Sequence, residues 1–333
     1  MSEYVKYVPW AIPAYFIVDT VFRKTRSGSK PVVTCFLDAI LAPLCWLRVG
    51  PWGKSNMPEA VMADVIIETK LMDAGMTQGK GPTFIDRYHI AREDGLRNAA
   101  CRLSPTGYLI SRQSMAKRVE TRLKMLEYLK RHPAAVKKPM AKPVFVVGFT
   151  RTGTTFLHEL LGLHPDVKMH YTWEQIEPVP RTEAEDPASL AKDRDERYQT
   201  NRREFDLKLA LAGSAIQSIH RVGYDEPEEC TTPCAVELPW NVPDLPLMAL
   251  AADTVLPLGA GDAFKWYRRY LQILGFSTSG VGTVSKRKEK DKTWMLKCPF
   301  HLPYLKELGD EFQGSVVVWT HRNPVSCIGS ACS

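Results

Sequence analysis

The stretch PVFVVGFTRTGTTFLHELLGL, residues 143–163, decides the fold of this chain. Its first part, Val144–Val147, is a short β-branched and aromatic run, which predicts a buried strand. A glycine-containing loop, Gly148–Thr155, follows, and an amphipathic helix is expected over roughly residues 154–163. Strand, glycine loop and helix in this order form the context in which helix N-terminal N–H groups bind a phosphate-like anion.

The loop is similar to the nucleotide P-loop GxxxxGK[ST], with one difference at the lysine. Gly148 and Gly153 fall in register with the two glycines, and Thr155 takes the hydroxyl position. Thr154 stands where nucleotide-binding loops have a lysine that reaches the β- and γ-phosphates, which argues against a nucleoside triphosphate. Arg151 can supply the charge instead, because a guanidinium binds a tetrahedral oxyanion through a fork of N–H donors.

A second unit of the same kind lies near the carboxyl end of the chain. Thr293–Lys297 and Ser315–Thr320 predict two more buried strands, with a helix between them. Arg322 follows the second strand, and Val325–Ser333 predicts the opening of a further helix. A βαβ unit has parallel strands, and ligands of parallel sheets bind at the carboxyl ends of the strands. The loop at Gly148, together with Lys297 and Arg322, is therefore expected at one edge of a sheet.

These patterns predict an α/β fold, a P-loop-like parallel sheet flanked by helices, with an N-terminal helical region. Three parts are expected: residues 1–57 with apolar segments, a helical region over 58–140, and an α/β domain over 141–333. Within the second part, Pro58–Leu71 and Ser114–Arg131 predict helices. The Pro- and Lys-rich stretch 133–142 predicts a linker.

The N-terminal part carries two apolar runs, residues 8–18 and Pro31–Leu47, with four basic residues between them. The second run is shorter than the roughly 20 residues that a bilayer span needs, and Asp38 interrupts it. A signal anchor, a buried helical hairpin and a helix lying on a membrane surface all remain open. A membrane contact through residues 8–47 is expected in two of the three. The compartment follows from this choice: an anchored protein with a lumenal domain if Pro31–Leu47 spans, the cytoplasm if not.

Two motifs of this sequence, the loop that begins at Gly148 and the segment that contains Arg322, resemble those of a known family. The loop GFTRTGTTFLHELLGLHPDV, residues 148–167, resembles the 5′-phosphosulfate-binding loop of sulfotransferases that use 3′-phosphoadenosine 5′-phosphosulfate. HRNPVSCIGS, residues 321–330, resembles their 3′-phosphate motif, with Arg322 and Ser330 in the two binding places. Arginine in the first loop is similar to the bacterial-type and tyrosylprotein-type branch. The likeness extends over roughly residues 80–333.

The resemblance implies transfer of a sulfuryl group from that co-substrate to an acceptor hydroxyl or amine. By family position, the 5′-phosphosulfate would be held by Arg151, Thr152, Gly153, Thr154 and Thr155. Lys297 would stabilise the bridging oxygen. The general base is left between Glu174 and His301, with Glu228 and Glu229 as further acidic candidates. No metal is expected, and the acceptor could be a small molecule, a carbohydrate or a protein.

Two alternatives belong to other functional classes. A catalytically silent, membrane-associated protein could retain the fold, and a P-loop kinase would use a similar loop. Members of the family continue well past the position that corresponds to Ser333, so a C-terminally incomplete domain is expected here.

Composition excludes several classes without choosing among enzymes. The chain of 333 residues is 44% hydrophobic and 24% charged, which excludes disordered and collagenous proteins. Its net charge of +7 is a mild excess for a chain of this length, too dilute to predict nucleic acid as a partner by itself. The eight cysteines include no CxxC pair, so packed, reduced thiols are expected.

Overall fold

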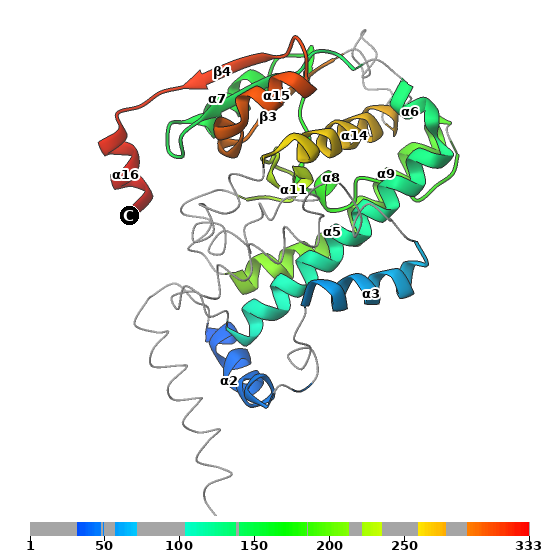
Figure 1. Ribbon diagram of the computed structural model, residues 1–333, viewed down its shortest axis with the longest axis vertical. Coiled ribbons are helices and arrows are strands. Elements are labelled where there is room, and N and C mark those ends of the chain that lie inside the picture. The colour runs from blue at the N-terminus through cyan, green and yellow to red at the C-terminus, as the bar shows by residue number, and fades with distance from the viewer. Residues whose placement is uncertain are drawn as a thin grey trace, which may run out of the picture.

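The computed structural model describes residues 32–47, 49, 57–71, 104–137, 140–184, 186–212, 222–234, 259–277 and 292–332. The apolar run at 8–18 and the basic residues before Pro31 lie outside these ranges. Figure 1 shows the parallel sheet near one end of the long axis and the first described helix near the other.

Four parallel strands form the sheet, in the order β2-β3-β1-β4. They are β1 (Val144–Gly148), β2 (Val167–Lys168), β3 (Thr293–Lys297) and β4 (Val316–Thr320). The central strand β1 pairs with β3, where Val146 lies opposite Lys297, and with β4, where Gly148 lies opposite Thr320. The predicted α/β class and the parallel sheet are confirmed, and three of its strands lie where the sequence places them.

The helices of the described residues fall into two groups. Around the sheet lie α7 (Thr154–Gly162), α14 (Gly261–Ser277), the 3-10 helix η7 (Pro299–Tyr304) and α15 (Leu305–Glu311), and α16 (Pro324–Cys332) lies beyond the end of β4 (Figure 1). The others are α2 (Val32–Trp46), α3 (Met57–Thr69), α5 (Pro105–Arg131), α6 (Pro133–Lys137), α8 (Thr172–Ile176), α9 (Pro187–Ala212) and α11 (Thr231–Cys234). None of the helices in the described ranges is long and apolar enough to cross a membrane.

Two helical boundaries differ from the sequence prediction. Helix α5 begins at Pro105 rather than near Ser114, because the hydroxyl of Ser104 accepts the N–H of Gly107 at 3.2 Å and caps the helix. A proline at the first helical position adds to this start. The segment predicted as a linker contains α6, whose Ala135 is fully buried.

Strand β4 is more exposed than the sequence predicts. The run Ser315–Thr320 predicts a buried strand, and the strand is present at Val316–Thr320, but Val316, Val317 and Trp319 are about half exposed. In the described sheet β4 is the edge strand and pairs with β1 alone. An uninterrupted apolar run therefore does not establish which strands lie inside a sheet.

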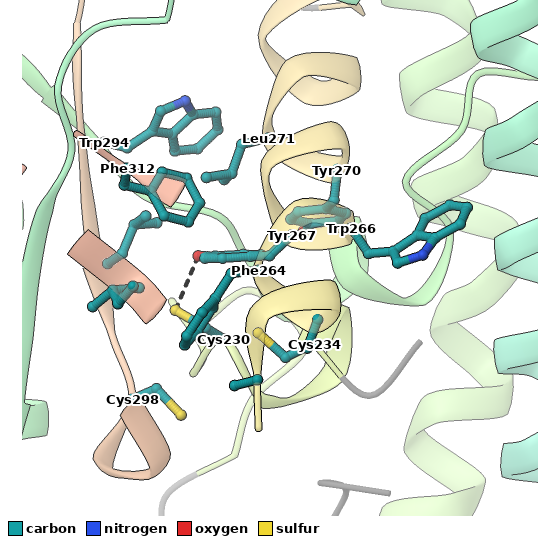
Figure 2. Close-up of a cluster of buried hydrophobic side chains, with 14 of the residues drawn as sticks. Cys230, Cys234, Phe264, Trp266, Tyr267, Tyr270, Leu271, Trp294, Cys298 and Phe312 are labelled. Atoms are coloured by element: carbon teal, nitrogen blue, oxygen red, sulfur yellow. Dashed lines mark hydrogen bonds between the residues drawn. The ribbon is translucent and has the colours of Figure 1, made fainter. Parts of the chain in front are cut away.

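The main hydrophobic core lies between the sheet and α14, whose inner face is almost entirely apolar or aromatic. Figure 2 shows Tyr267 and Leu271 of α14 directed toward the side where Trp294 of β3 and Phe312 lie, with Phe264 on the same side of the helix. Burying such large side chains stabilises the fold by about 1.5–3 kcal/mol each. The core therefore fixes β3, and with it Lys297 at the end of that strand.

Three buried histidines make the stability of this fold depend on pH. Burial lowers the pKa of His158 to about 4 and the pKa of His170 and of His301 to about 3. All three stay neutral in the folded chain, whereas the unfolded chain binds protons near the ordinary value of about 6.5. Stability is therefore complete above that value and is lost as the pH falls below it.

We expect the free energy of unfolding to fall by roughly 1 kcal/mol per histidine for each pH unit between about 6.5 and the lowered pKa of that histidine. Urea unfolding followed by circular dichroism at about pH 7 and about pH 5 measures this directly. Equal unfolding midpoints at the two values would show that the histidines do not remain neutral in the folded state.

Candidate functional site

The loop between β1 and α7 turns sharply through two residues in the left-handed region. Arg151 has a φ of 69° and Gly153 a φ of 91°, and Gly153 is the N-cap of α7. A left-handed backbone is unusual for an arginine and often marks a binding loop. The loop thus presents the positive end of α7, which favours an anion.

Threonine hydroxyls brace this loop against the edge strand. The Thr152 hydroxyl oxygen lies 2.6 Å from the carbonyl oxygen of Phe149 and 2.7 Å from the Thr320 hydroxyl oxygen. Thr320 also donates to the carbonyl of Val147 at 3.3 Å. The loop is therefore held by the carboxyl ends of both β1 and β4. Thr320 takes part in these contacts, and it is not among the site residues that the sequence predicts.

Gly148 leaves the space that these hydroxyls occupy. A Cβ added there would overlap the Thr320 hydroxyl and would lie 2.7 Å from Thr152 Oγ1 and 2.9 Å from the Thr320 carbonyl oxygen. We expect Gly148→Ala to lower the free energy of unfolding by about 1–3 kcal/mol, as overpacking does. Gly309→Ala, where an added Cβ meets nothing within 4 Å, is the matched control. Chemical denaturation of both variants measures the difference, and equal unfolding midpoints would contradict this close packing.

The two predicted phosphate motifs lie against each other. Arg151 donates from Nε to the hydroxyl of Ser330 at 2.9 Å, and Arg322 donates from Nη1 to the Arg151 carbonyl at 3.2 Å. Arg322 follows β4, and Ser330 lies on α16. The structure therefore brings together residues that are about 170–180 positions apart in the sequence.

Lys297 ends β3 beside the N-terminus of α7 and is 1% exposed. Its ammonium donates to Glu229 Oε1 at 2.7 Å and to the Thr155 hydroxyl at 3.3 Å. The Glu229 side chain is 16% exposed, so the pair is shielded and still reachable from outside. The site thus holds a carboxylate, an ammonium and a helix N-terminus next to each other.

A chain of buried hydrogen bonds supports the backbone of Lys297. Cys230 donates to the Lys297 carbonyl from its N–H at 3.0 Å and from its thiol at 3.3 Å. Tyr267 donates to Cys230 Sγ at 2.9 Å, as Figure 2 shows, and its hydroxyl lies 3.1 Å from Nε2 of His170. This chain fixes Cys230, and therefore also the neighbouring Glu229, relative to Lys297.

Glu174, one of the two residues predicted as the base, serves at the start of α8. It accepts the N–H of Tyr171 at 3.0 Å and pairs with Arg194 at 3.5 Å. Burial raises its pKa, and Arg194 opposes that shift. Within the described part of the chain, Glu174 forms no hydrogen bond to Lys297 or to the loop.

His301, the other predicted base, lies inside the aromatic core and is completely buried. The rings of Phe145 and Phe264 lie 5.6 and 5.2 Å away, and that of Tyr267 lies 6.3 Å away. Neither ring nitrogen of His301 has a hydrogen-bond partner among the described residues. The structure therefore does not bring His301 to the loop.

The arrangement suits the transfer of an anionic group. The α7 N-terminus, Arg151 and Arg322 can bind an anionic ligand. Lys297 can stabilise negative charge that develops on a leaving group during the reaction, and the Glu229 carboxylate can accept a proton. No group of three or more metal-ligating side chains occurs within the described ranges.

Comparison with known proteins gives one family and two similar structures. The family model described as "Sulfotransferase family" matches residues 143–333. Sulfotransferase STF1 from Mycobacterium tuberculosis H37Rv is 24% identical with a TM-score of 0.59, over 81% of this chain and 68% of that one. Sulfotransferase STF9 from Mycobacterium avium is 20% identical with a TM-score of 0.58, over 82% of this chain and 64% of that one. None of the curated protein sequences matches the chain significantly. Both structures support the fold.

Proposed function

The chain belongs to the sulfotransferase family, and we therefore propose that it moves a sulfuryl group from 3′-phosphoadenosine 5′-phosphosulfate to an acceptor hydroxyl or amine. The observation that carries this proposal is the meeting of Arg151, Lys297 and Arg322 around the N-terminus of α7. These cations come from the ends of three parallel strands, where the ligand of such a sheet binds.

The donor fits the residues present. The 5′-phosphosulfate would lie on the turn formed by Arg151, Thr152, Gly153, Thr154 and Thr155. The 3′-phosphate would lie by Arg322 and Ser330. Because Arg151 donates to Ser330, the two parts of the donor site are linked before any ligand binds, which lowers the cost of ordering them.

We assign the base to Glu229 rather than to Glu174 or His301. Glu229 is the carboxylate in contact with Lys297, whereas Glu174 is engaged at a helix start and His301 is enclosed by aromatic rings. A general base must lie within hydrogen-bonding reach of the proton that it removes. Glu229 is the candidate whose contact with Lys297 places it at the proposed transfer site, and we therefore assign it this role.

The proposed transfer is a displacement at the sulfur atom of the donor. The acceptor oxygen or nitrogen attacks the sulfur, and its proton passes to the Glu229 carboxylate. The bond between sulfur and the bridging oxygen breaks, and the electron pair stays on the phosphate of the departing adenosine 3′,5′-bisphosphate. Lys297 and the N–H groups of α7 stabilise the charge that builds on that oxygen.

The experiment for this proposal follows the sulfur. The chain is incubated with donor labelled in its sulfuryl group and with a panel of phenols, sugars and amines. We expect label to enter at least one acceptor while adenosine 3′,5′-bisphosphate is released in equal amount. Transfer of labelled phosphate from ATP to the same panel would instead support the kinase alternative, which the family match does not favour.

A further inference from the structure

Helix α2 is amphipathic in the reverse of the usual sense. The residues that face the rest of the protein are small or polar and nearly fully buried: Thr34, Cys35, Asp38 and Ala39. The residues directed outward are large and apolar, and they recur at helical spacing: Phe36, Ile40, Leu44 and Leu47, with Trp46 beside them. We call these five residues the α2 stripe. Their exposed fractions run from 41% to 67%.

A polar contact fixes this orientation. The Asp38 carboxylate accepts the N–H of Thr106 at 2.8 Å and also the hydroxyl of Thr106, in the first turn of α5. A carboxylate is favoured at a helix N-terminus, where it satisfies free N–H groups and meets the positive end of the dipole. Rotating α2 to bury the stripe would break this contact, so the outward direction of the stripe is built into the fold.

The sequence around the stripe is strongly basic. Between Thr20 and Met57 there are six cationic residues, namely Arg23, Lys24, Arg26, Lys30, Arg48 and Lys54. Asp38 is the one acidic residue in that stretch, and it faces α5. An apolar stripe flanked by cations complements a surface that is apolar inside and anionic at its rim.

We propose that the α2 stripe docks on the surface of an anionic phospholipid bilayer. With 15 residues, α2 is about 22 Å long, which is short of the roughly 30 Å of a bilayer core, so it lies in the interface. Trp46 near its end suits the headgroup level, where tryptophan is enriched. Pairing of two copies through this stripe is disfavoured, because it would bring together two segments that each carry six cations and one acidic residue in sequence.

Vesicle sedimentation of the full chain tests this inference. We expect binding to vesicles of phosphatidylcholine mixed with phosphatidylglycerol, weaker binding to phosphatidylcholine alone, and loss of binding as salt is raised. The double variant Phe36→Asp with Ile40→Asp should bind the mixed vesicles at least about tenfold more weakly. Arg23→Glu with Lys24→Glu should weaken binding to the mixed vesicles and not to phosphatidylcholine alone.

Leu163→Asp, which changes an 80% exposed leucine at the end of α7, is the matched control and should bind as the wild type does. Figure 1 shows α7 and α2 near opposite ends of the described part of the chain, so Phe36→Asp with Ile40→Asp should not alter nucleotide binding. Equal vesicle binding by the wild type and Phe36→Asp/Ile40→Asp would overturn the proposal. So would a wild-type dimer that becomes a monomer in this variant, or a large loss of its thermal stability, because either shows that protein covers the stripe.

Discussion

Replacing Lys297 by methionine should lower kcat for sulfuryl transfer by about 10²–10³-fold. The ammonium of Lys297 lies 3.3 Å from the Thr155 hydroxyl at the start of α7, where the departing phosphate is expected. The Lys297 side chain is 1% exposed, so water cannot reach the position of the missing ammonium and stabilise the phosphate in its place. Methionine keeps the length and the apolar stem, so the change is the loss of the ammonium together with its pair to Glu229.

The measurement is kcat and KM for the donor in the variant and in Lys306→Met. Lys306 is an exposed lysine paired with Asp310, so this control makes the same chemical change away from the site and should leave kcat unchanged. A Lys297→Met protein that folds, binds nucleotide and retains kcat within about threefold would remove Lys297 from the transfer step.

Glu229→Gln should lower kcat by about 10²–10⁴-fold while leaving the affinity for adenosine 3′,5′-bisphosphate nearly unchanged. Glutamine is close in size and can still accept a hydrogen bond from Lys297, but it cannot take the acceptor's proton. The loss should be largest for acceptors with high pKa values, because their protons need the strongest assistance.

Glu174→Gln is the discriminating control for the base. Glutamine can accept the Tyr171 N–H as glutamate does, so the helix start is kept and only the pair with Arg194 is lost. We expect kcat to change less than about threefold. The opposite pattern, a large loss in Glu174→Gln and none in Glu229→Gln, would return the role of base to Glu174.

The sheet could be predicted because its determinants are local. Consecutive residues form recognisable patterns for the short apolar strands, the glycine loop and the helix that follows it. These patterns place Lys297 and Arg322 at the ends of strands. The parallel arrangement then requires those ends to share an edge. The sequence of a strand does not determine its position in the sheet. Strand β4, the most apolar run of the three, lies at an exposed edge.

The choice among acidic residues could not be made from the sequence. Glu229 reaches Lys297 only because Cys230 donates to the Lys297 carbonyl, a contact between segments 67 positions apart. His301 follows Lys297 by four positions, yet η7 turns its ring into the aromatic core. Proximity in sequence thus indicates the right region and not which side chain faces the site.

The most direct test of the account is thermal unfolding of the full chain with and without adenosine 3′,5′-bisphosphate. At 100 times the dissociation constant, binding should stabilise the fold by about 2.7 kcal/mol. We expect a rise in Tm of several degrees, a smaller rise with adenosine 5′-monophosphate, and none in Arg322→Ala. A well-folded protein whose Tm does not move with adenosine 3′,5′-bisphosphate would contradict the claim that this sheet edge binds the sulfuryl donor.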